Sequence, residues 1–147
     1  MHRRPILPAG SQYRAGAVAS PMPRILVLDD DDLFRHYLTA LLERAGYEVR
    51  PLQNGVGVER AMARERFDAV VTDLYMPHSD GLETLRLVKG LSPSLPVIGI
   101  SSGIPNDPCA RAMSVMGAEI VLTKPLDEAA FLAALHRAMT RSVSQAS

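Results

Sequence analysis

The sequence lacks most of the features that mark secreted, membrane or thiolate-metal proteins. Its single cysteine, Cys109, excludes an internal disulfide and a multi-cysteine zinc site, which fits a reducing compartment. No apolar run approaches the roughly 18 residues that suggest a membrane span. Sixteen basic residues balance sixteen acidic ones, so no net positive field favours non-specific nucleic-acid binding. We therefore expect a cytoplasmic protein with no membrane segment and no direct contact with nucleic acid.

The length of 147 residues fits one domain. Residues 1–22 are expected to form a flexible N-terminal extension, because prolines interrupt them and they lack the continuous apolar stretch of a signal peptide. Residues 23–140 are expected to fold, and residues 141–147 to form a flexible C-terminal tail. This division predicts a single folded unit.

Short apolar runs alternate with segments of helical periodicity, which is typical of an α/β fold built around a parallel sheet. The run 25–28 is continuously apolar, as a strand covered on both faces requires. The pattern predicts five strands, at residues 25–28, 47–52, 69–72, 96–100 and 119–122. It also predicts five helices, at residues 32–45, 56–66, 82–91, 106–116 and from the cap at Asp127 to Thr140. A five-stranded, doubly wound sheet flanked by helices follows.

Polar side chains stand where the predicted strands end. These residues are Asp29 and Asp30 after the first strand, Asp73 after the third, Ser101 after the fourth and Lys124 after the fifth. Neighbouring parallel strands bring their carboxyl ends into one crevice, where open α/β sheets bind ligands. Unpaired charges are expensive to bury in a core, whereas carboxylates suit Mg²⁺, which prefers oxygen ligands. The pattern predicts a magnesium site in this crevice.

Carboxylates can also act as nucleophiles that form aspartyl-phosphates. Asp73, at the end of a central apolar strand, is the candidate nucleophile. Lys124 is then placed to pair with phosphoryl oxygens as a point charge, and the Ser101 hydroxyl to donate a hydrogen bond to another oxygen. Singly, Ser101 and Lys124 have no more specific meaning than a loop serine and a surface lysine. Only their joint placement with the aspartates favours a functional role.

At these residues the sequence resembles the receiver domains of two-component response regulators. The resemblance covers about residues 24–139. It rests on five ordered motifs: ILVLDDD at 25–31, DAVVTDLYMP at 68–77, DGLE at 80–83, PVIGISS at 96–102 and KP at 124–125. It implies a stand-alone, flavodoxin-like receiver domain with strand order 2-1-3-4-5 over residues 23–140.

The resemblance also implies a set of roles for the site residues. Asp73 would be phosphorylated by a sensor histidine kinase, a histidine phosphotransfer protein or a small phosphodonor. Asp30 and Asp73 would bind Mg²⁺ directly, the Tyr75 backbone carbonyl would complete the protein ligands, and Asp29 would act through a metal-bound water. The chain would then be a signalling switch with self-phosphorylation and dephosphorylation chemistry, and not a turnover enzyme.

Three positions depart from the family pattern or modify it. Val121 stands where an aromatic side chain usually turns inward, so the usual coupling between Ser101 and that aromatic is in doubt. Ser102 follows the switch hydroxyl where alanine or glycine is usual. Tyr75, two residues after the phosphoacceptor, is expected to obstruct the water that attacks the phosphoryl group. The resemblance further suggests a cis bond before Pro125.

Several other residues have simpler interpretations. Asp31 and Asp32 are expected to begin the first helix, where aspartates bind free amides and favour the helix dipole. Asp80 is expected to be a loop residue before the third helix. Cys109 and His36 show no ligand or catalytic spacing, so we assign no chemistry to either.

Two other functions remain open. A magnesium-dependent phosphohydrolase would also use a strand-end aspartate, with Asp29 and Asp31 in an Asp-x-Asp arrangement, but it needs a substrate cap and a late acidic pair. An interaction module with the same fold would not depend on phosphorylation, and Val121 gives that alternative weight. Output is expected through a downstream protein target. Homodimerisation through the face formed by residues 106–116, 119–122 and 128–140 is the other route.

Overall fold

The computed structural model describes residues 22–76 and 80–146. Their elements follow in the order β1 (Arg24–Leu28), α1 (Asp32–Arg44), β2 (Glu48–Leu52), a 3₁₀ turn (Gly55–Gly57), α2 (Val58–Arg64), β3 (Ala69–Asp73), α3 (Gly81–Leu91), β4 (Val97–Ser101), α4 (Pro108–Val115), β5 (Ile120–Thr123) and α5 (Glu128–Ala146). The predicted extension, apart from Met22, and Pro77 of the third-strand motif lie outside the described residues. All five predicted strands and five predicted helices are present.

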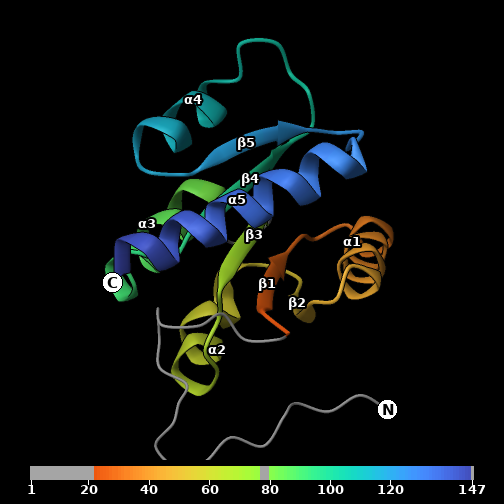
Figure 1. Cartoon of the computed structure of the whole chain (residues 1–147). Helices are drawn as coiled ribbons and strands as arrows, with labels where there is room; N and C mark the ends of the chain where they lie inside the picture. The colour runs from red at the N-terminus through yellow and green to blue at the C-terminus, as the bar shows by residue number, and fades with distance from the viewer. Residues whose placement is uncertain (1–21, 77–79, 147) are drawn as a thin grey trace, which may run out of the picture.

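The five strands form one parallel sheet in the order β2-β1-β3-β4-β5, as predicted. Residues of β1 alternate between the two faces of the sheet. Leu26 and Leu28 pack into one apolar cluster with residues of α2, α3 and α4, and Ile25 and Val27 pack into a second cluster with residues of α1 and α5. Figure 1 shows these helices around the sheet, with α5 crossing one of its faces. The double covering explains why every residue of the central strands β3 and β4 is buried.

The helix starts follow the polar residues that the sequence places there. Asp31 caps α1 by accepting hydrogen bonds from Leu33 N and Phe34 N, and Asp80 caps α3 by accepting one from Glu83 N. Both aspartates satisfy amides that have no partner inside their helix. The structural interpretation of Asp31 and Asp80 is therefore confirmed.

The last helix is longer than the sequence pattern predicts. Its predicted end at Thr140 is wrong, because α5 continues to Ala146. In the added turns Arg141 forms an ion pair with Glu119 at 2.8 Å, and the Ser142 hydroxyl donates to the Ser94 carbonyl at 2.6 Å. These contacts with residues before β4 and β5 are long-range, so local periodicity carries no signal for them.

The start of α3 packs directly against the end of β3. Gly81 N donates to the Leu74 carbonyl at 2.7 Å. A Cβ atom at Gly81 would lie 2.9 Å from Leu74 Cα, 3.1 Å from the Asp73 carbonyl oxygen and 3.1 Å from Met113 Sδ. Only glycine fits this contact without displacing backbone, which fixes the spacing between α3 and the strand that carries Asp73.

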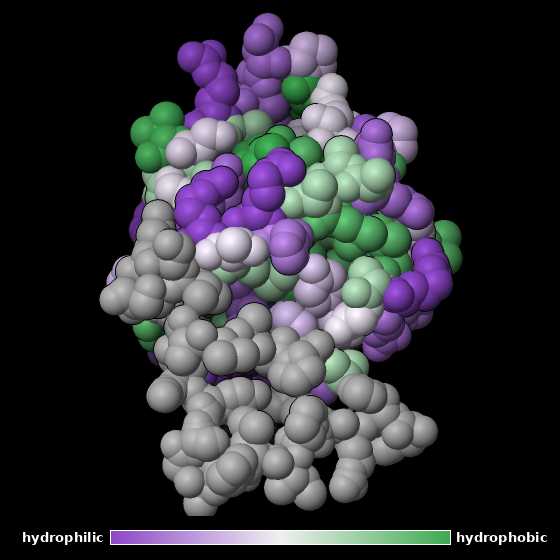
Figure 2. Space-filling model, in the orientation of Figure 1, coloured by the Kyte–Doolittle hydropathy of each residue, from purple (hydrophilic) through white to green (hydrophobic). Residues whose placement is uncertain are grey.

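The Lys124–Pro125 peptide bond is cis, as the family resemblance suggests. Among the described residues, no helix has both the length and the apolar character needed to cross a bilayer. Figure 2 shows hydrophilic residues interspersed with hydrophobic ones over the visible face of the described part.

Candidate functional site

Three aspartates converge at the carboxyl end of the sheet. Asp73 is the last residue of β3, while Asp29 and Asp30 follow β1 directly. One carboxylate oxygen from each lies within 4.8 Å of the others. Asp29 is fully buried, Asp73 is 8% exposed and Asp30 is exposed. The strands β1 and β3 are hydrogen-bonded neighbours, so this grouping follows from the topology.

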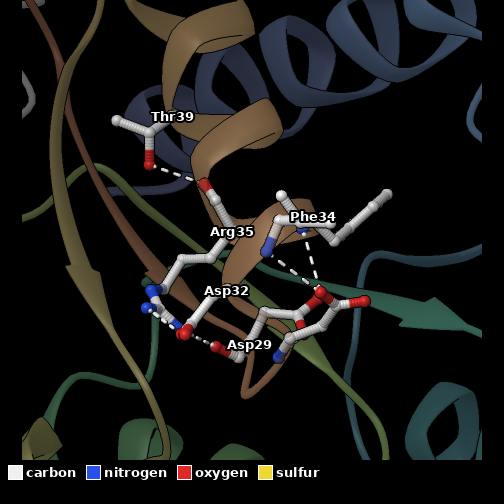
Figure 3. Close-up of polar contacts among 7 residues, drawn as sticks. Asp29, Asp32, Phe34, Arg35 and Thr39 are labelled. Carbon is white, nitrogen blue, oxygen red and sulfur yellow. Dashed lines mark hydrogen bonds and ion pairs between the residues drawn. The ribbon is translucent and has the colours of Figure 1, made fainter.

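The turn after β1 is held by hydrogen bonds that leave part of Asp29 unsatisfied. Asp29 Oδ1 accepts from Asp31 N at 2.8 Å, and the buried Arg35 guanidinium of α1 donates to the Asp29 backbone carbonyl at 2.8 Å. Arg35 also pairs with Asp32, as Figure 3 shows. Within the described residues, Asp29 Oδ2 is buried and has no hydrogen-bond partner. The carboxylate is therefore fixed in place with one oxygen available to a further ligand.

Lys124 lies beside this oxygen. Its Nζ is 3.5 Å from Asp29 Oδ2, an ion-pair distance that is longer than the usual 2.7–2.9 Å of a charge-assisted hydrogen bond. The same nitrogen lies 4.2 Å from the centroid of the Phe34 ring on α1, within the range of a cation–π contact. Lys124 follows β5 by one residue, so the structure brings it to the same edge of the sheet as the aspartates.

Burial and like charge oppose ionisation of the two buried aspartates. Desolvation raises the pKa of Asp73 to about 6, with the Asp29 charge adding to the rise and Lys124 opposing it. Desolvation also raises the pKa of Asp29, against the Asp31 amide and Lys124, which lower it. A pKa of about 6 leaves Asp73 mainly ionised at neutral pH, although its charge is held in an unfavourable environment. A cation would relieve this cost.

Ser101 ends β4 as predicted but does not contact the three carboxylates by hydrogen bonds. Its hydroxyl donates to Asp107 Oδ2 at 3.3 Å and accepts from Gly103 N at 3.1 Å. Asp107 also accepts a 2.6 Å hydrogen bond from the Tyr75 hydroxyl. The structure therefore brings together Asp29, Asp30, Asp73 and Lys124, and it ties Ser101 and the Tyr75 side chain to the loop before α4.

Two residues of the site region were not predicted from the sequence. Asp107 is 5% exposed and caps α4 by accepting from Cys109 N. The pair Asp107-Pro108 is a common helix start, which would have located the cap but not its contacts with Tyr75 and Ser101. Phe34 belongs to the apolar pattern of α1, and nothing in that pattern indicates a contact with Lys124.

Known proteins resemble this chain in sequence. A model of the response regulator receiver domain matches residues 25–136. The DNA-binding transcriptional regulator NtrC of Bradyrhizobium sp. is 36% identical over 119 residues, which are 81% of this chain and 25% of that protein. The response regulator receiver protein CpdR of Brucella abortus is 36% identical over 80 residues, which are 54% of this chain and 67% of that protein.

A solved structure gives the same result for the fold. The response regulator receiver domain protein of Clostridium thermocellum superimposes with a TM-score of 0.76 at 29% identity, covering 82% of this chain and 96% of its own. By contrast, the chain spans a quarter or less of the length of larger regulators that it matches. Their whole activities therefore do not transfer to it.

Proposed function

The chain belongs to the response regulator receiver domain family, and we propose that it is a switch operated by magnesium-dependent phosphorylation of Asp73. A sensor histidine kinase or a histidine phosphotransfer protein would supply the phosphoryl group in the cytoplasm. The observation that carries the proposal is the convergence of Asp29, Asp30 and Asp73 within 4.8 Å at the end of a buried strand.

The residues present fit Mg²⁺. The donor set consists of hard oxygens, and the buried Asp29 Oδ2 lacks a hydrogen-bond partner among the described residues. Asp30 and Asp73 would bind the ion directly, with the Tyr75 backbone carbonyl as third protein ligand, and Asp29 would act through a bound water. When bound, the ion would offset the repulsion among the carboxylates and neutralise charge on the phosphoryl oxygens.

The ionised Asp73 carboxylate is the nucleophile that accepts the phosphoryl group. One of its oxygens forms the new P–O bond while the bond from phosphorus to the donor breaks, and the donor leaves with the electron pair. For a phosphohistidine donor that bond is P–N, and for an acyl phosphate it is P–O. Lys124, 3.5 Å from Asp29, would pair with a phosphoryl oxygen, and Ser101 would turn to donate a hydrogen bond to another.

Output would follow through protein–protein contact with a downstream target, and the only chemistry of the chain would be its own phosphorylation and dephosphorylation. One observation favours a second candidate, an interaction module that does not need phosphorylation. Val121 is a short side chain packed against the apolar cluster, in the place where the family has its rotating aromatic. The two candidates differ in whether Asp73→Asn changes partner binding.

Intact-protein mass spectrometry after treatment with acetyl phosphate and Mg²⁺ tests the proposal. The wild-type chain should gain one phosphoryl group, which EDTA should prevent and Asp73→Asn should abolish. Asp32→Asn is a matched control, since Asp32 is an exposed aspartate at the start of α1 that pairs with Arg35. Adduct formation in Asp73→Asn would refute the assignment of the phosphoacceptor.

The same reaction separates the proposed switch from a phosphohydrolase. A receiver domain should consume about one equivalent of donor per cycle of adduct formation and slow hydrolysis. A phosphohydrolase should release many equivalents of phosphate rapidly, and Asp29→Asn should stop this release. Rapid turnover that depends on Asp29 would overturn the proposed function.

A further inference from the structure

A second polar network lies beside the three carboxylates and connects the ends of β3 and β4 with the start of α4. Its centre is Asp107, a carboxylate 5% exposed that accepts three hydrogen bonds. The donors are the Tyr75 hydroxyl at 2.6 Å, Cys109 N at 2.9 Å and the Ser101 hydroxyl at 3.3 Å. We call these residues the Asp107 network.

The three hydrogen bonds differ in strength. The bond from Tyr75 is short, and it accounts for a raised pKa at Tyr75, about 12, and a lowered pKa at Asp107. The bond from Ser101, at 3.3 Å, is longer than the roughly 2.5–3.0 Å that is usual for hydroxyl donors. The Ser101 contact is therefore the one that gives way most easily, whereas Asp107 stays attached to Tyr75 and to the first turn of α4.

The Ser101 hydroxyl cannot serve two acceptors at once. A serine hydroxyl carries one proton to donate, and in the present structure Asp107 accepts it. A phosphoryl group on Asp73 would be a strong competing acceptor at the neighbouring strand end. If Ser101 donates to the phosphoryl group, Asp107 loses one of its three donors while buried and faces additional negative charge nearby. Both effects make the present position of the Asp107 carboxylate less favourable and so favour its movement.

We propose that Asp107 is a positioning residue that couples phosphorylation of Asp73 to α4 and to Tyr75 through its hydrogen bond with Ser101. The inference rests on the proposed function, because the competing acceptor is the phosphoryl group. In the unphosphorylated chain Asp107 holds Ser101 away from the three carboxylates. When Ser101 leaves, the change reaches α4 directly, since Asp107 caps that helix.

This route does not pass through residue 121. The usual receiver switch depends on an aromatic side chain at that position, and Val121 cannot supply one. The Asp107 network connects the Ser101 hydroxyl to α4 through the loop between β4 and α4, without a contribution from β5. The network therefore provides a route by which phosphorylation of Asp73 can alter α4 without the aromatic side chain.

Two backbone amides report on the network in a ¹H–¹⁵N spectrum. Gly103 N donates to Ser101 Oγ, so its shift reports the serine, and Cys109 N donates to Asp107, so its shift reports the cap. In the wild type, phosphorylation with acetyl phosphate and Mg²⁺ should shift both. For each variant, the change in the Cys109 amide chemical shift on phosphorylation is divided by the adduct fraction from mass spectrometry. In Ser101→Ala this normalised change should be at least about fivefold smaller than in the wild type. Ser102→Ala, the same change at an exposed neighbour, should behave as wild type.

A second variant tests the holding role of Asp107 in the unphosphorylated chain. Asp107→Asn keeps the shape and the cap but replaces the oxygen that accepts from Ser101 with a donor. The Ser101 hydroxyl would then have its proton free to donate to the phosphoryl group, which should raise the rate of phosphorylation by acetyl phosphate about fivefold or more. Asp80→Asn removes the same charge from the cap of α3, which has no bond to Ser101, and should leave the rate nearly unchanged.

The outcomes separate the two proposals. Absence of an adduct on Asp73 in the wild type would refute the proposed function. An adduct with a Cys109 shift that is undiminished in Ser101→Ala would refute the coupling. If Ser101→Ala forms too little adduct for comparison, the rate of Asp107→Asn decides, and a rate no greater than that of Asp80→Asn would overturn the role of Asp107.

Discussion

Acidic side chains at the two ends of the sheet differ in how many cationic partners they have. At the amino end, Arg24 of β1 pairs with Glu48 of β2 at 2.9 Å and with Glu65 at 3.8 Å, and Arg50 pairs with Glu65 at 2.6 Å. At the carboxyl end, the one ion pair that the described residues make to the carboxylates of Asp29, Asp30 and Asp73 is that of Lys124 with Asp29, at 3.5 Å. Arg35 lies nearby, but it binds the Asp29 backbone carbonyl and pairs with Asp32. One cluster is neutralised from within the chain and the other is not.

This difference distinguishes carboxylates that are paired within the chain from carboxylates that could bind a ligand. Paired, half-exposed charges add little to stability and leave nothing for a ligand to do. Carboxylates that are buried without a matching set of cations raise the free energy of the folded chain, and a cation or a phosphodonor can recover it. The same residue types therefore have different meanings at the two ends, and the number of cationic partners decides between them.

The largest expected effect is on the rate of phosphorylation when the Lys124 charge is removed from the carboxyl end. Lys124→Met should slow adduct formation by acetyl phosphate by about 100-fold, because it removes the charge proposed to stabilise the transferred phosphoryl group. Lys89→Met is the control, since Lys89 Nζ donates to the carbonyls of Pro93 and Leu95 at the other end of the sheet. Equal rates for the two variants would contradict the role of Lys124.

The next effect is a pH-dependent increase in the free energy of unfolding when the Asp73 carboxylate is replaced by an amide. The folded pKa of Asp73, about 6, exceeds its ordinary value of 3.8, so the protonated carboxyl favours folding below pH 3.8 and this advantage is lost as the pH rises through 6. Without metal, Asp73→Asn should therefore be more stable than wild type by about 2–3 kcal/mol at pH 7.5, and the gap should narrow toward pH 4.

Urea unfolding in EDTA at several pH values measures this gap. Glu65→Gln sharpens the comparison, because the loss of a paired carboxylate at the amino end should produce no gain in stability at any pH. A gap for Asp73→Asn that widens toward low pH would contradict a raised pKa at Asp73.

A smaller effect is expected from magnesium itself. At a concentration ten times its dissociation constant, Mg²⁺ should stabilise the wild-type chain by about 1.4 kcal/mol, since a ligand that binds only the folded state shifts unfolding by mass action. Asp30→Asn should lose most of this gain and Glu65→Gln should retain it. Thermal unfolding with and without the ion measures the effect, and an equal gain in all three chains would place the binding site elsewhere.

The smallest effect is expected at the amino end. Glu65→Gln should cost no more than about 1 kcal/mol, because its ion pairs with Arg24 and Arg50 are partly exposed. The cost should shrink in 1 M salt, where the screening length falls to about 3 Å. Denaturant unfolding at two ionic strengths checks this prediction, and a cost that is large and independent of salt would mean that the pairs are more than surface contacts.

The sequence was informative where local rules decide the structure. Apolar runs that end in polar residues located the strands, and the topology then required Asp29 and Asp73 to meet, because β1 and β3 are neighbours. It was uninformative where loops choose the contacts. The hydrogen bonds of Asp107 with Tyr75 and Ser101 join residues separated by 32 and 6 positions through non-repetitive backbone, for which no periodic signal exists.

The contact between Gly81 and Leu74 limits how this site can be altered. A methyl group at residue 81 would collide with main-chain atoms of Asp73, the proposed phosphoacceptor, and of Leu74, and main chain cannot rotate aside as a side chain can. Directed-evolution libraries aimed at new phosphodonors should therefore keep this codon fixed. Diversity introduced at exposed neighbours such as Ser102 would leave the support of Asp73 intact.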